Sequence, residues 1–130
     1  MNIKFSTLFL ALFLPVSGTV AAADIESWAK PVDSKVLAWR RDIHQFPELG
    51  NREFRTSKLV AEHLRQLGLE VTTGIAHTGV IAILKGGKPG PRIALRADMD
   101  ALPVTENSGL PFESKQTAEF RGEKTGVMHA

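Results

Sequence analysis

Two aspartates, Asp98 and Asp100, are the residues of this chain whose spacing most strongly suggests chemistry. They follow the apolar run of residues 93–95, at the end of a predicted strand. Aspartate is disfavoured within strands, and the ligands of α/β proteins bind where strands end. If the strand continues, both carboxylates lie on one face, where like charges need a cation or hydrogen-bond donors between them. Two interpretations stay open: a role beside a metal ion, or a strand-end turn that accepts backbone N–H groups.

The four histidines do not spell out a local metal site, because no two of them have the spacing of a helical or zinc-finger pair. His44, near a predicted helix end, and His63, within a predicted helix, are expected to be structural. The glycine-rich residues 85–90 lack the spacing of a phosphate-binding loop, and no helix follows them. We interpret them as a hairpin loop.

Two helices are predicted ahead of the aspartates. The first covers residues 34–46, with Asp33 or Ser34 as its N-cap. The second starts after Asn51 as its N-cap and ends at Gly68, where a left-handed residue terminates helices well. Its apolar residues recur at helical spacing and form one stripe: Phe54, Val60, Ala61, Leu64 and Leu67.

After the helices the hydrophobic pattern becomes strand-like, which indicates an α/β fold. Residues 69–73 form a short candidate strand. The apolar runs at residues 79–84 and 93–95 are joined by a Gly/Pro turn, so we expect antiparallel neighbours that are buried on both faces. The helices would cover one face of this sheet. From residue 104 onward the pattern weakens, and no further element is predicted.

The composition and the N-terminal segment indicate which partners and which cellular location to expect. Residues 1–23 combine one lysine with an apolar core and a small-residue exit, as in a secretory signal peptide too short to span a membrane comfortably. We expect an exported protein, periplasmic or secreted, with no stable membrane span after signal removal. The chain has 16 basic and 14 acidic residues, which argues against nucleic-acid binding. It has no cysteine, so no disulfide framework is expected.

Six segments, in their order and wording, make this chain resemble the N-terminal part of the M20-type metallo-amidohydrolases. The resemblance covers residues 39–130 and is strongest to the branch with hippurate hydrolases, N-acyl-amino-acid amidohydrolases and auxin-conjugate hydrolases. The segments that carry it are Arg40–Leu49, Thr56–Leu69, Thr78–Val80, Ala94–Pro103, Gly109–Phe112 and Gly126–Ala130.

This resemblance implies that residues 24–130 form the N-terminal portion of a zinc-peptidase-like catalytic domain, an α/β fold with helices packed on a central mixed β-sheet. It implies a full-length enzyme that hydrolyses a small-molecule N-acyl amino acid, such as hippurate, to an amino acid and a carboxylate. Two divalent metal ions of the zinc or manganese type would serve it, with a glutamate deprotonating the bridging water. A homo-oligomer would form through a second domain.

The resemblance also limits the roles of the residues present here. In this branch the first metal ligands stand in a Cys-Gly-His-Asp run, which would follow Ala130. Asp98 and Asp100 are therefore expected to orient ligands or hold the strand end, and His129 adjoins the ligand run without being a ligand. No catalytic residue and no metal ligand is assigned within the 130 residues.

Taken alone, the chain is expected to be inactive, to bind no metal ion tightly and to be poorly soluble, because apolar strands are left uncovered. Two alternatives differ in class: a short exported binding or interaction module without chemistry, and a pseudogene product. A third differs only in substrate, namely a peptidase or deacetylase of the same superfamily that acts on cell-wall intermediates.

Overall fold

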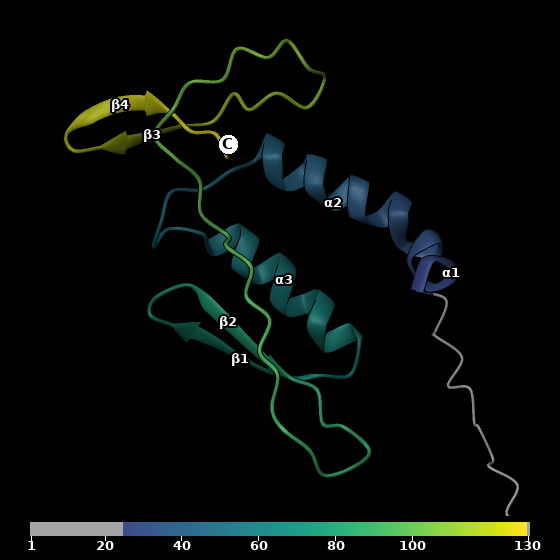
Figure 1. Cartoon of the computed structure of the whole chain (residues 1–130). Coiled ribbons are helices and arrows are strands. Elements are labelled where there is room, and N and C mark those ends of the chain that lie inside the picture. Colours follow the sequence, from purple (N-terminus) through teal and green to yellow (C-terminus); the bar gives the residue numbers. More distant parts are fainter. Residues whose placement is uncertain (1–24, 130) are drawn as a thin grey trace, which may run out of the picture. The chain divides into compact units, whose positions relative to one another are not determined.

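The computed structural model describes residues 25–129, so the predicted signal peptide, residues 1–23, lies outside the described residues. The chain divides into two compact units, Met1–Pro31 and Val32–Ala130. The first unit contains a short helix, α1 (Ile25–Ala29), and the 3-10 turn η1 (Lys30–Val32) leads into the second. All other elements that the structure describes belong to the second unit (Figure 1).

Helix α2 (Asp33–Gln45) ends two residues before Pro47, as the prediction from the proline requires. Its N-cap is Val32, which makes no side-chain capping bond, so the predicted caps Asp33 and Ser34 were wrong. The physical reason is η1, which runs directly into the helix and brings Asp33 into its first turn. There the carboxylate favours the positive end of the helix dipole.

Helix α3 (Phe54–Gln66) has Glu53 as its N-cap, and the predicted cap Asn51 was wrong. Asn51 instead has a φ of 63°, a left-handed conformation that asparagine tolerates, and it turns the chain ahead of the helix. At the other end Gly68 has a φ of 78°, which confirms its predicted place after the last helical turn.

Helices α2 and α3 contact each other through polar and aromatic side chains. Arg55 donates from Nη2 to both carboxylate oxygens of Asp42 at 2.7 Å. The Trp39 ring lies 4.5 Å, centroid to centroid, from the imidazole of His63. His63 is half-buried in this contact, as expected for a structural residue at the boundary of a helix.

Strands β1 (Glu70–Ile75) and β2 (Gly79–Ile83) form an antiparallel hairpin that contacts α3 (Figure 1). On the α3 stripe Ala61 is 1% exposed. Ile81 and Ile83 share one face of β2 and are 49% and 52% exposed. The helix therefore covers one face of the hairpin, and the predicted burial of this run on both faces was wrong.

Residues 92–97 form no strand, and β2 pairs with β1 instead, so the predicted pairing of residues 79–84 with residues 93–95 was wrong. The side chains of Ile93 and Leu95 are 87% and 97% exposed. A strand needs a neighbour for its backbone N–H and C=O groups and a layer over its apolar side chains. Within the described residues this run has neither, and its β propensity alone does not produce a strand.

A second hairpin lies in the polar region for which no element was predicted. It consists of β3 (Thr117–Phe120) and β4 (Glu123–Gly126), which pair antiparallel. Its two turn residues, Arg121 and Gly122, have φ values of 56° and 84°. Positive φ at both positions is typical of the type I′ turn, which matches the twist of two short strands.

The α/β class is thus confirmed, with the strands in two separate two-stranded antiparallel sheets. The buried apolar cluster is small and consists of Leu49, Ala101 and Val127, with Ala118 packed against it. Across residues 25–129, every helix falls short of the length and hydropathy that a bilayer crossing would require.

The exposed apolar run predicts self-association. We expect the chain Asp24–Ala130 to elute as oligomers or aggregate at micromolar concentration, since large exposed apolar patches associate in water. The variant Ile93→Ser/Leu95→Ser should shift it toward the monomer in size-exclusion chromatography. A control variant, Val36→Ser, removes an apolar side chain that is 51% exposed on α2 and should leave the profile unchanged. A monomeric wild-type chain with a cooperative melt would contradict this prediction.

Candidate functional site

The two predicted site residues lie on an irregular segment. Asp98 accepts a contact from Nη2 of Arg96 at 2.6 Å, and both side chains are largely exposed. Asp100 is exposed beside Gly50, where a Cβ atom would lie 3.6 Å from the Asp100 Oδ2. Because no strand runs through them, the condition for a shared strand face is not met. Their roles beside a metal centre stay predictions.

The backbone directly after Asp100 is held by the turn that links α2 to α3. The Ala101 N–H donates to the Glu48 carbonyl at 2.8 Å. Leu49 and Ala101 form a parallel bridge. Both side chains are buried, at 6% and 5% exposure, so the bridge is packed as well as hydrogen-bonded.

The backbone after Asp100 also pairs with a segment near the C-terminus. Leu102 and Met128 form an antiparallel bridge and exchange two hydrogen bonds, of 2.9 and 3.1 Å. We call the resulting arrangement the three-segment junction, and it comprises residues 48–49, 101–102 and 127–128. Asp100 directly precedes the second of these segments, and His129 directly follows the third. The junction therefore brings together two residues that the sequence resemblance placed near the metal centre.

Glu48 caps α3 in addition to holding Ala101. Its Oε1 accepts the Arg55 N–H at 2.9 Å, and its Oε2 accepts the Thr56 N–H at 2.8 Å. These are two of the first helical N–H groups, which have no partner inside a helix. Sequence reasoning missed this role because a capping side chain normally belongs to the residue next to the helix, not to one several residues earlier.

Glu106 is a second carboxylate that sequence reasoning missed, and it is buried, at 8% exposure. His44 Nε2 lies 3.0 Å from both of its oxygens, Ser108 Oγ donates to it at 2.6 Å, and the Ser114 N–H donates at 2.7 Å. The Ser114 hydroxyl in turn donates to the Val127 carbonyl at 2.7 Å. His44 is thus structural, as predicted, but through a partner far away in the sequence.

These hydrogen bonds shift the ionisation of Glu106 strongly. The Ser108 hydroxyl, then the His44 imidazole, then the Ser114 amide stabilise the carboxylate, and desolvation opposes them only in part. Together they lower the pKa of Glu106 from 4.5 to about 2. The group is therefore ionised at neutral pH and acts as an acceptor, not as a proton donor.

Two further buried carboxylates hold loops in the same way. Burial raises the pKa of Glu53, but the Thr78 hydroxyl and nearby backbone N–H groups more than offset this and lower it. The Lys115 ammonium, 2.6 Å from Glu113, lowers the pKa of Glu113, and the Gly109 N–H at 2.8 Å adds to the effect. Glu53 is paired with the turn between β1 and β2, and Glu113 is paired within its own loop. Both carboxylates are thus already engaged, which argues against a catalytic use.

The residues present do not by themselves fit a metal centre. Within residues 25–129 no three histidine, aspartate or glutamate side chains are grouped so that they could hold an ion. Asp98 contacts Arg96 instead, and His129 is exposed. The described residues therefore contain no ligand set for an ion.

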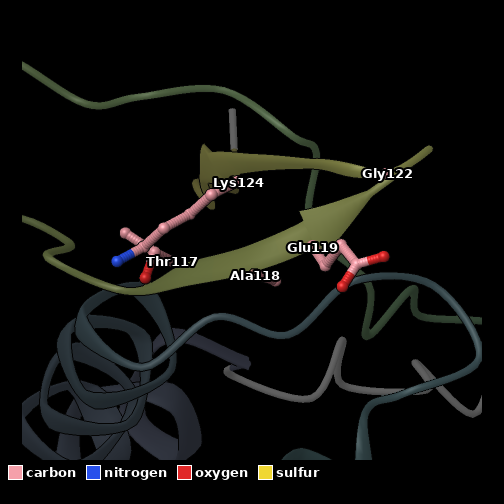
Figure 2. Close-up of a pocket in the computed structure, with 5 residues that line it drawn as sticks. All are labelled: Thr117, Ala118, Glu119, Gly122 and Lys124. Carbon is pink, nitrogen blue, oxygen red and sulfur yellow. The ribbon is translucent and has the colours of Figure 1, made fainter.

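Two shallow hollows adjoin β3, and neither is lined by Asp98 or Asp100. Figure 2 shows the first, on the second hairpin, where Glu119 and Lys124 come from facing positions of β3 and β4. The second lies beside the three-segment junction and is lined in part by Arg52, whose Nη1 donates to the Glu119 carbonyl at 2.8 Å. These hollows do not enclose a reacting group.

The capping role of Glu48 predicts a stability loss on substitution. Glu48→Gln replaces one acceptor oxygen by an NH₂ group that faces a backbone N–H, and it removes the charge at the helix N-terminus. We expect a loss of about 1–2 kcal/mol in the free energy of unfolding. The control Glu62→Gln touches an exposed pair with Lys58 at 3.9 Å and should cost less than about 0.5 kcal/mol. Urea denaturation at submicromolar concentration measures both, and equal losses would contradict the capping role.

The lowered pKa of Glu106 predicts an acid-dependent loss of stability. Because its pKa in the folded chain is about 2 against an ordinary 4.5, its contribution is complete above pH 4.5 and is lost as the pH falls toward 2. Glu106→Gln should lower stability at neutral pH and flatten this acid limb. The measurement is urea denaturation at a series of pH values, and an unchanged acid limb in the variant would contradict the assignment.

Comparison with known proteins finds several hydrolases among the relatives of this chain, although no family model matches it. It is 49% identical over 108 residues to thermostable carboxypeptidase 1 of Saccharolobus solfataricus, which covers 82% of this chain and 24% of that protein. It is 48% identical over 91 residues to the hippurate hydrolase of Campylobacter jejuni, which covers 70% of this chain and 22% of that protein.

The fold agrees with the sequence relatives. A solved dinuclear metal-binding peptidase of the M20 family from Bacillus subtilis matches with a TM-score of 0.65 and 40% identity, over 77% of this chain and 26% of that one. The chain thus spans about a quarter of the length of the proteins it matches. Sequence and fold together place this chain in the M20 family of amidohydrolases and peptidases.

Proposed function

We propose that this chain forms part of a metal-dependent amidohydrolase that hydrolyses N-acyl amino acids, such as hippurate, to an amino acid and a carboxylate. The observation that carries the proposal is the high identity to relatives named as a hippurate hydrolase and a carboxypeptidase, both of which cleave an amide bond next to a free carboxylate. The fold match to a dinuclear metal-binding peptidase supports two divalent metal ions, of the zinc or manganese type.

In this proposal the described residues supply the wall of the site and not its reacting groups. Asp98 and Asp100 stand at the rim, and the three-segment junction fixes Asp100 beside the segment that ends at His129. The metal ligands and the general base are proposed to lie outside residues 25–129, because the described residues contain no suitable cluster. Oligomerisation through a second domain belongs to the same proposal.

A hybrid enzyme tests the activity. The 91-residue matching stretch of the Campylobacter jejuni hippurate hydrolase is replaced by the corresponding part of this chain. We expect the hybrid to hydrolyse hippurate within about tenfold of the parent enzyme, because the walls of homologous sites tolerate substitutions that keep the packing. Chelation should abolish turnover, and zinc or manganese should restore it. A folded hybrid that loads metal but does not turn over would contradict the proposal.

The same hybrid addresses substrate class. N-benzoyl and N-acetyl amino acids, an N-acetylated cell-wall intermediate and a short peptide with a free C-terminus separate the amidohydrolase, deacetylase and carboxypeptidase alternatives. We expect the N-acyl amino acids to have the highest kcat/KM. A preference for the peptide would move the assignment to the carboxypeptidase relative.

The rival is a non-catalytic exported module, which would also lack a metal-ligand cluster within the described residues. The gene sequence beyond codon 130 separates the two, because a Cys-Gly-His-Asp continuation supports the enzyme and a stop codon supports the module or a pseudogene. Export is part of both proposals. A mature N-terminus at Ala23 or Asp24, read by mass spectrometry of the secreted or periplasmic product, would support it.

A further inference from the structure

A continuous chain of hydrogen bonds joins helix α2 to the three-segment junction. It starts at the imidazole of His44, 3.0 Å from both oxygens of Glu106, and it continues from Glu106 to the Ser114 N–H at 2.7 Å. The Ser114 hydroxyl then reaches the Val127 carbonyl at 2.7 Å. Met128, the next residue, is bridged to Leu102.

The chain of contacts is buried and crosses a long stretch of sequence. Glu106 and Ser114 are 8% and 5% exposed, so these bonds compete little with water. His44 and Glu106 are 62 positions apart, which makes their contact a tertiary one. The Phe112 and His44 rings also pack in a T-shaped arrangement, with centroids 5.7 Å apart.

Glu106 has hydrogen-bond partners outside its own loop as well as within it. Among the described residues Glu113, a neighbouring buried carboxylate, accepts hydrogen bonds from Gly109 and Lys115, both within its own loop. Glu106, in contrast, takes one bond from α2 and one from the residue that holds Val127. A group placed in this way fixes two distant segments relative to each other.

We propose that Glu106 is a positioning residue that ties α2 to the three-segment junction. Through the junction it sets the relative placement of Asp100 and His129, the two residues that adjoin it. The catalytic consequence rests on the function proposed above, whereas the structural link does not.

The direct test uses the chain Asp24–Ala130 with the Ile93→Ser and Leu95→Ser substitutions, which are expected to keep it monomeric. Labelled histidine then gives one signal for each of its four imidazoles. In Glu106→Gln we expect the signals of both His44 and His129 to move, while those of His63 and His77 stay in place. Hydrogen exchange of the Leu102 and Met128 amides should become about tenfold faster, because a buried charge-assisted bond is lost.

A matched control and a second variant make the result decisive. Glu113→Gln, in the other buried carboxylate of this loop, should leave His129 and the two junction amides unchanged. Ser114→Ala keeps the bond from its own N–H to Glu106 but removes the bond to Val127. It should therefore speed exchange at Leu102 and Met128 without moving His44.

Two outcomes would overturn the proposal. One is a Glu106→Gln chain in which His44 moves but His129 and the junction amides do not, since Glu106 would then hold only its own loop. If Glu106→Gln also removes the protection of β1 and β2, the chain has unfolded as a whole and Ser114→Ala decides instead. Unchanged exchange at Leu102 and Met128 in that variant is the second contradicting outcome.

The activity arm uses the hybrid enzyme. Glu106→Gln should lower kcat about tenfold with little change in KM, as expected when the geometry of the reacting groups is disturbed and substrate binding is not. Glu113→Gln should change neither constant. A kcat unaffected by Glu106→Gln would remove the catalytic consequence. An inactive unmodified hybrid would count against the proposed function alone, because the histidine and exchange measurements still decide the link.

Discussion

The double use of Glu48 is the constraint on which the second unit depends. Its carboxylate occupies the first free amides of α3, and its carbonyl accepts the amide that follows Asp100. Because α3 in turn contacts the β1–β2 hairpin, one residue connects a helix, a hairpin and the candidate site. Unpaired N–H groups at a helix N-terminus or in a buried backbone segment destabilise the fold, and Glu48 supplies hydrogen-bond acceptors for both.

Buried carboxylates do much of the organising that apolar packing does in larger domains. The apolar cluster comprises Leu49, Ala101 and Val127, whereas Glu53, Glu106 and Glu113 are all buried. Each carboxylate accepts bonds from hydroxyl, amide or ammonium groups in loops that lack regular structure. Buried polar groups that are fully paired fix one conformation firmly, and the lowered pKa values of all three record this pairing.

Sequence reasoning succeeded where structure depends on nearby residues. The presence and approximate position of α3, β1 and β2, and the left-handed Gly68, follow from periodicity and from local backbone preference. It failed where a partner decides the outcome. Residues 92–97 include an apolar run but have no neighbouring strand within the described chain. The I′ turn of the second hairpin was obscured by Arg121, at a position where asparagine or glycine is usual.

The candidate site likewise contains residues that local sequence patterns identified and residues that they did not. Asp98 and Asp100 were identified from local spacing and from a resemblance, but the residues that hold their surroundings, Glu48 and Glu106, were not. Both act across contacts that no local pattern encodes, such as that between Glu106 and His44. Residues 25–129 contain no group of side chains that could hold an ion, so the ligands of a metal centre are proposed to lie outside them.

The distance along the chain between the partners at the three-segment junction has a consequence for how the protein acquires its shape. The two hairpins close over turns of a few residues, so they can form within microseconds of collapse. The junction has to bring together three stretches that are separated by long loops. Closing those loops lowers the conformational entropy of the chain before any stabilising contact can form. Docking of the 101–102 backbone between its two neighbours is therefore expected to be the slow event, completed only after both hairpins exist.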